Sequence, residues 1–149
     1  MLKRDYLLKL VQDLFAAIND LLTKDTDELE RQREIEALYT QFGEGARFFR
    51  SAEAADIVAT VARAAADAQG VQPDELSANE MEQRLDLLAT LMYADFKSSN
   101  LTDNARRDVA ERALSLAIMI NQSSDTYSFE RLGRISELQQ FLTTGAKTL

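Results

Sequence analysis

The chain has 149 residues, of which 46% are hydrophobic and 28% are charged. This length and composition indicate one folded domain over 1–149 and argue against extensive disorder. The formal net charge of −8 repels phosphate backbones, so we expect no nucleic-acid partner. Cys and His are both absent, which excludes disulfides, thiol nucleophiles, thiolate metal sites, imidazole bases and Ser-His-Asp triads.

The distribution of apolar residues argues against a membrane-spanning helix and against a signal peptide. No apolar run approaches the roughly 18 residues that a membrane-spanning helix needs, so we expect no membrane partner. The basic residues Lys3 and Arg4 precede an apolar stretch, but polar side chains from Lys9 onward interrupt it, and no signal peptide is predicted. We therefore expect an acidic, cytoplasmic protein that is not an enzyme, with no catalytic residue, no metal and no cofactor.

The first predicted element is an amphipathic helix over 1–23, regular from about Lys3. Its apolar residues fall in one arc of roughly 160° on a helical wheel. They are Leu7, Leu8, Leu10, Val11, Leu14, Phe15, Ile18, Leu21 and Leu22. Because this arc is too wide for one neighbouring helix, it must pack against two or more helices, or against one helix and a partner.

One edge of that arc is formed by Leu8, Phe15 and Leu22, which repeat every seven residues as in a coiled coil. The other apolar positions of the helix can satisfy the core of the domain itself. We predict that this edge contacts another protein, most simply a second copy in a two-fold dimer. The alternative is that the second and the last helices cover the whole arc.

A second helix is predicted over about 28–42. Asp25 can cap it, with Glu28 in the capping-box position three residues later. Gly43 is well placed to end this helix in a left-handed conformation.

A third helix is predicted over 52–69, with Ser51 as its cap and Gly70 after its end. Before it, the aromatic pair Phe48 and Phe49 is expected to anchor the connection in the core, or else to form an exposed contact site. Because the helix is rich in alanine on almost every side, it can approach its neighbours closely, and we expect it to be internal. Its exposed strip is predicted at Glu53, Asp56, Arg63 and Asp67.

The clearest helix start lies at 76–81. Ser77 and Glu80 stand in capping-box positions, and Leu76 and Met81 stand in the two positions of a hydrophobic staple. A fourth helix is therefore predicted from this point to about Lys97.

Thr102 is the predicted cap of a fifth helix, which ends near Ser123. Its segment 113–120 is apolar on nearly every side, which makes it the second candidate for an internal helix. Ser128 is the predicted start of the sixth helix, and 143–149 is expected to be a loose tail.

Two charged residues fall among apolar positions. On the fourth helix Asp95 lies inside the apolar arc, and on the fifth helix Arg106 does the same. If these helices form an antiparallel hairpin, both residues lie near the same turn, and a partly buried ion pair between them is predicted. Two alternatives are a polar contact with a ligand and fraying that leaves both side chains in water.

Two short stretches resemble the ends of a group of small, uncharacterised bacterial helical proteins. They are Lys3-Arg4-Asp5-Tyr6-Leu7-Leu8 and Thr126-Tyr127-Ser128-Phe129-Glu130-Arg131. The C-terminal halves of those proteins are compared to tetratricopeptide-like helical hairpins. The resemblance implies a bacterial origin and an all-helical fold, and it implies no activity, substrate or site residue.

Taken together, these patterns predict an all-α fold of about six helices, as an antiparallel bundle or a short stack of helical hairpins. The absence of a catalytic constellation and the wide face of the first helix favour a protein–protein interaction or scaffold domain that self-associates. The alternative is a binder of small molecules or peptides that uses a groove between helices.

Overall fold

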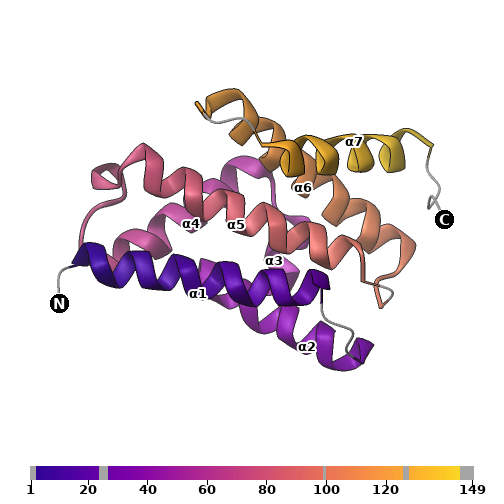
Figure 1. Ribbon diagram of the computed structural model, residues 1–149, viewed down its shortest axis with the longest axis horizontal. Helices are drawn as coiled ribbons and strands as arrows, with labels where there is room; N and C mark the ends of the chain where they lie inside the picture. The colour runs from indigo at the N-terminus through magenta and orange to yellow at the C-terminus, as the bar shows by residue number, and fades with distance from the viewer. Residues whose placement is uncertain (1–2, 24–26, 99, 126–127, 145–149) are drawn as a thin grey trace.

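The computed structural model describes residues 3–23, 27–98, 100–125 and 128–144, with the side chains of the first helix from Lys9 onward. Within these ranges the chain is all-α, as predicted, and contains no strand (Figure 1). The elements are α1 (Lys3–Thr23), α2 (Glu28–Tyr39), α3 (Ala46–Ser51), α4 (Ala54–Gln69), α5 (Ala78–Phe96), α6 (Asp103–Ser123) and α7 (Phe129–Thr144), with short 3-10 turns at Thr40–Phe42 and Pro73–Glu75.

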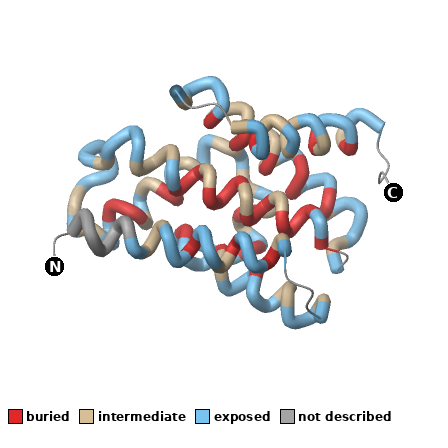
Figure 2. The backbone as a smooth tube through the Cα atoms, in the orientation of Figure 1, coloured by how far each residue is buried: buried red, intermediate tan, exposed pale blue. Residues whose placement is uncertain are grey.

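The central element is α5. It packs against α6 as an antiparallel hairpin and also contacts α1 and α2, while α7 packs on α6 and α3 lies against α6. Buried positions follow α5 and α6 through the middle of the molecule, whereas the outer face of α1 is exposed (Figure 2). No helix within the described ranges is long and apolar enough to cross a bilayer.

The prediction that the alanine-rich helix is internal is wrong. Although its predicted exposed strip is exposed, α4 also exposes Ala55, Ala59 and Ala68. Ten of the 19 residues of α5 are buried, against five of the 16 residues of α4. The larger apolar side chains of α5 fill more of the core, and α4 lies at its edge.

Three of the predicted helix caps are confirmed. The hydroxyls of Ser77, Thr102 and Ser128 accept hydrogen bonds from backbone N–H groups three residues later, at 3.1, 3.2 and 3.1 Å. Ser51 is not a cap, because its hydroxyl bonds back to the carbonyl of Arg47. The predicted cap Asp25 lies outside the described residues, and part of the predicted tail, Thr143 and Thr144, belongs to α7.

The short helix α3 was not predicted, and it explains the failure at Ser51. Phe49 is fully buried and stacks on Tyr39 of α2, with ring centroids 5.6 Å apart. Arg112 of α6 donates to the carbonyls of Ser51 and Ala52, at 2.9 and 3.0 Å. The connection between α2 and α4 is thereby folded as a helix whose carboxyl end is capped by another helix.

Gly43 takes the left-handed conformation that was predicted, with φ of 110°. The chain turns here between α2 and α3, and the backbone passes close to α4. A Cβ atom at this position would lie 2.8 Å from the Cβ of Ala64. Both the backbone conformation and the close approach therefore require glycine.

Replacing Gly43 by Ala is expected to lower the free energy of unfolding by about 2–4 kcal/mol, since it adds left-handed strain and a steric clash. The measurement is urea unfolding followed by circular dichroism. The control is Gly45→Ala, because Gly45 has φ of −81° and a Cβ atom there meets nothing within 4 Å. Equal stability of the two variants would contradict the packing described here.

Candidate functional site

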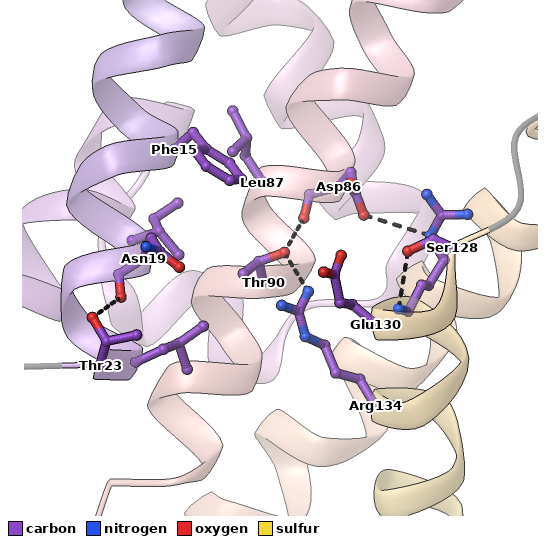
Figure 3. Close-up of a pocket in the computed structure, with 12 residues that line it drawn as sticks. Phe15, Asn19, Thr23, Asp86, Leu87, Thr90, Ser128, Glu130 and Arg134 are labelled. Atoms are coloured by element: carbon purple, nitrogen blue, oxygen red, sulfur yellow. Dashed lines mark hydrogen bonds and ion pairs between the residues drawn. The ribbon is translucent and has the colours of Figure 1, made fainter.

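A groove runs between α1 and α7, with α5 as its floor. It consists of two cavities of about 350 and 690 Å³ that share Leu22, Glu130 and Arg134. We call the two cavities together the α1–α7 groove. Figure 3 shows the smaller cavity, with Phe15 beside Leu87 on one side and Glu130 and Arg134 reaching in from α7 on the other.

The α1 side of the groove is mainly apolar, with the polar side chains of Asn19 and Thr23 beside the apolar ones. Ile18 is buried and Leu22 is half-buried, but the Phe15 side chain is 62% exposed at the rim. Leu87 of α5 lies at the bottom of the same cavity. The groove therefore presents one of the few large hydrophobic side chains that the described fold leaves in water.

The α7 side of the groove is charged. Arg134 donates from Nη1 to the hydroxyl of Thr90 at 3.0 Å, and its guanidinium lies over the Tyr93 ring, 5.4 Å from the centroid. Among the described residues, no carboxylate lies within 4.0 Å of the Arg134 guanidinium. This includes the carboxylate of Glu130, four residues earlier on α7. Arg134 is thus held in place by a hydroxyl and an aromatic ring rather than by a counter-charge.

Arg131 is the second arginine of this wall, and only 7% of it is exposed. Its Nε lies 3.6 Å from a carboxylate oxygen of Asp86, which is an ion pair but too long for a hydrogen bond. Nε and Nη1 have no hydrogen-bond partner among the described residues. Folding therefore gives this guanidinium a counter-charge but leaves the donors of these two nitrogens unbonded.

A polar cluster lines the larger cavity. Glu137 of α7 accepts from the Tyr93 hydroxyl and from Nζ of Lys97, both at 2.6 Å. Burial would raise the pKa of Glu137, but the bonds from Lys97 and Tyr93 outweigh it and hold that pKa below its ordinary value. Burial and the neighbouring Glu137 carboxylate raise the pKa of Tyr93 to about 12. This cluster ties α7 to the end of α5.

Of the predicted interaction residues, Phe15 and Leu22 line the smaller cavity together. The side chain of Leu8 lies outside the described residues. The exposure of Phe15 also shows that α2 and α7 do not cover the whole apolar arc of α1, so that alternative is wrong at Phe15. Sequence reasoning missed Arg131 and Arg134, whose spacing of three residues on one helix face was the available signal.

The predicted ion pair between Asp95 and Arg106 is wrong, because each of the two residues binds other groups. Asp95 is fully buried, but it accepts from the Tyr39 hydroxyl at 2.7 Å and from Arg50 at 2.8 and 2.9 Å. Arg106 is also buried, and it donates to the backbone carbonyls of Phe96 and Leu101. Arg106 therefore caps the carboxyl end of α5, where the helix dipole favours a cation.

The cluster of Asp95, Arg50 and Tyr39 is structural rather than catalytic. Burial, followed by the nearby Asp95 carboxylate, raises the pKa of Tyr39 well above its ordinary value. Burial opposes the charge of Arg50, but its hydrogen bonds to Asp95 raise the Arg50 pKa. Tyr39 and Asp95 have no exposed surface that a substrate could reach. The hydrogen bonds of this cluster join α2, α3 and α5.

Neither a metal-binding cluster among the described residues nor a known relative points to an activity. The described part of the chain holds no group of three or more carboxylate, imidazole or thiol side chains that could bind a metal ion. No family model matches this sequence, and no curated protein or solved structure matches it either. The groove is therefore the feature of the described structure that bears on function.

Replacing Asp95 by Ala is expected to lower the free energy of unfolding by about 3–5 kcal/mol, because Arg50 and Tyr39 would lose their buried partner. Urea unfolding of this variant beside Asp67→Ala, an exposed aspartate of α4, measures the effect. If both variants lost the same small amount, the cluster would not be the structural joint described here.

A pH dependence follows from the lowered pKa of Glu137. Its ionised form stabilises the fold above the pKa of an unfolded glutamate, about 4.3, and this contribution is lost as pH falls through the lower folded value. We expect Glu137→Gln to be less stable than the wild type at pH 7, with the difference shrinking toward pH 3. The control Glu34→Gln, at an exposed position of α2, is expected to follow the wild type. A difference that stays constant down to pH 3 would contradict this assignment.

Proposed function

We propose that this chain is a non-enzymatic protein-interaction domain that self-associates through the α1–α7 groove. The observation that carries the proposal is Phe15, which is 62% exposed at the rim of an apolar wall. Covering a phenylalanine and its apolar neighbours is the main source of free energy in most protein association. The absence of Cys fits a reducing compartment such as the cytoplasm.

The charge of the groove favours a second copy as its occupant. Its lining carries four cationic and three carboxylate side chains, whereas the whole chain has a formal charge of −8. The cations are Arg31, Lys97, Arg131 and Arg134. Two copies of an acidic chain repel each other least where such residues gather, so this face suits association of like chains.

The arrangement of the two walls also suits a two-fold contact. In an isologous interface the same patch meets itself, so the patch must be self-complementary. The mainly apolar side chains of α1 and the positively and negatively charged side chains of α7 meet that requirement. A two-fold axis would set Phe15 of each copy against the groove of the other. The cations of one α7 can then lie near Glu130 of its partner.

The mass in solution tests the proposal. The wild type is expected to show twice the monomer mass of 16.7 kDa by light scattering. Phe15→Glu is expected to be a folded monomer, because it removes the phenyl ring that the contact covers. Ala16→Glu, at the next and likewise exposed position of α1, adds the same charge outside the groove and is expected to stay dimeric.

Three outcomes would overturn this proposal. A wild type that is monomeric at every accessible concentration would remove self-association. A dimer that survives Phe15→Glu would place the interface elsewhere. Loss of the helical circular dichroism signal in Phe15→Glu would return Phe15 to the core of the domain, and Phe15→Ser then repeats the mass measurement with a milder change.

A further inference from the structure

Two arginines of α7 keep hydrogen-bond donors that the folded chain does not use, and both line the smaller cavity of the groove. Arg131 is buried with Nε and Nη1 unbonded. Arg134 uses only Nη1, in its bond to Thr90, so its Nε and Nη2 have no partner among the described residues. The unbonded nitrogens of Arg131 are shielded from solvent, whereas Arg134 is only half-buried. The unused donors of Arg134 are therefore the ones that a ligand in the cavity can reach.

We propose that this cavity binds a small organic molecule that consists of an apolar body and a single carboxylate. The inference rests on the unused guanidinium donors and not on self-association, so it goes beyond the proposed function. A carboxylate matches the planar fork of an arginine, which can donate two parallel hydrogen bonds to its two oxygens.

The geometry of the cavity fits such a molecule at both ends. Its volume of about 350 Å³ lies within the range of small-ligand sites, which are mostly apolar with a few polar groups that fix orientation. Phe15, Leu22 and Leu87 offer an apolar surface on the side of α1 and α5. Arg134 lies across the cavity from Phe15 and Leu87, on α7, as Figure 3 shows.

Arg134 is arranged in advance for its ligand. Its guanidinium is fixed by the Thr90 hydroxyl at 3.0 Å and by the Tyr93 ring at 5.4 Å. Little side-chain entropy remains to be lost when an anion binds, which is the usual gain from a preorganised site. Arg84 offers a contrast, because it is buried with two unbonded nitrogens but lines neither cavity of the groove.

The neighbouring acids decide which anion is suited to the cavity. Asp86 and Glu130 also line it and balance the formal charge of the two arginines. The cavity therefore offers hydrogen-bond donors without a strong positive potential. A phosphate dianion carries more charge, which costs more to desolvate, and it has no apolar body. A monocarboxylate joined to an apolar body gains hydrogen bonds and apolar contact together.

Isothermal titration calorimetry with octanoate, octanol and inorganic phosphate tests the proposal. Octanoate is expected to bind saturably, octanol at least about tenfold more weakly, and phosphate not measurably. Arg134→Gln is expected to weaken octanoate binding by at least about tenfold. The control Arg63→Gln removes an exposed arginine of α4 that lines neither cavity, and it is expected to bind octanoate as the wild type does.

A second arm separates the two sources of such a carboxylate. A hydrophobic tripeptide is titrated once with a free C-terminus and once amidated. Tighter binding of the free form than of octanoate would assign the site to peptide C-termini, and weaker binding would assign it to free organic acids. Both results support the carboxylate site. Equal binding of the free and amidated forms would speak against it.

The proposal is overturned if octanoate does not bind, if octanol binds equally well, or if Arg134→Gln binds octanoate as tightly as the wild type. Should Arg134→Gln lose its helical circular dichroism signal, Arg134→Lys keeps the charge without the fork and is expected to bind several-fold more weakly. Light scattering on the same samples reports self-association separately. A monomer that binds octanoate would refute only the dimer. If the wild type is a dimer, octanoate is titrated below the concentration at which it dissociates, where no second copy covers the cavity, and absence of binding there would refute only this site.

Discussion

The fold depends on one buried carboxylate. Asp95 lies on the inner face of the central helix, where an ionised group without partners would be too costly to bury. Its partners come from two other elements, since Tyr39 belongs to α2 and Arg50 to α3. Because the bonds to Arg50 are paired and short, they fix the direction of approach as well as the distance. The corner between α2 and α4 is thereby held against α5.

This joint also determines where the groove lies. Asp95 points from α5 toward α2 and α3, whereas Tyr93, Ala94 and Lys97 of the same turns line the groove. With α2 and α3 on one side of α5 and α6 against another, α1 and α7 remain separated across the face between them. One face of α5 thus binds α2 and α3, and another face of the same helix forms the floor of the α1–α7 groove.

The features that the sequence predicted correctly are those that depend on residues close together in the chain. Caps such as Ser77 and Thr102 act within one helical turn, so their hydrogen bonds could be read from spacing alone. The partner of Asp95 could not, because Arg50 lies 45 residues away and reaches it through a helix that no local signal predicted. The exposed edge at Phe15 followed from the width of an apolar arc, but the charged wall opposite depends on the packing of α7.

Two buried arginines differ in how far folding satisfies their hydrogen-bond donors. Arg106 donates to the carbonyl of Phe96 at the end of α5 and to that of Leu101 in the following loop, so both of its terminal nitrogens have acceptors and its Nε alone is left unbonded among the described residues. Arg131 ends beside a carboxylate that is 3.6 Å away, so folding supplies charge compensation but no hydrogen bond. A buried side chain whose donors have no acceptor lowers the free energy of unfolding. That cost remains in the folded chain, because Nε and Nη1 of Arg131 are shielded from solvent even though the residue lines the smaller cavity.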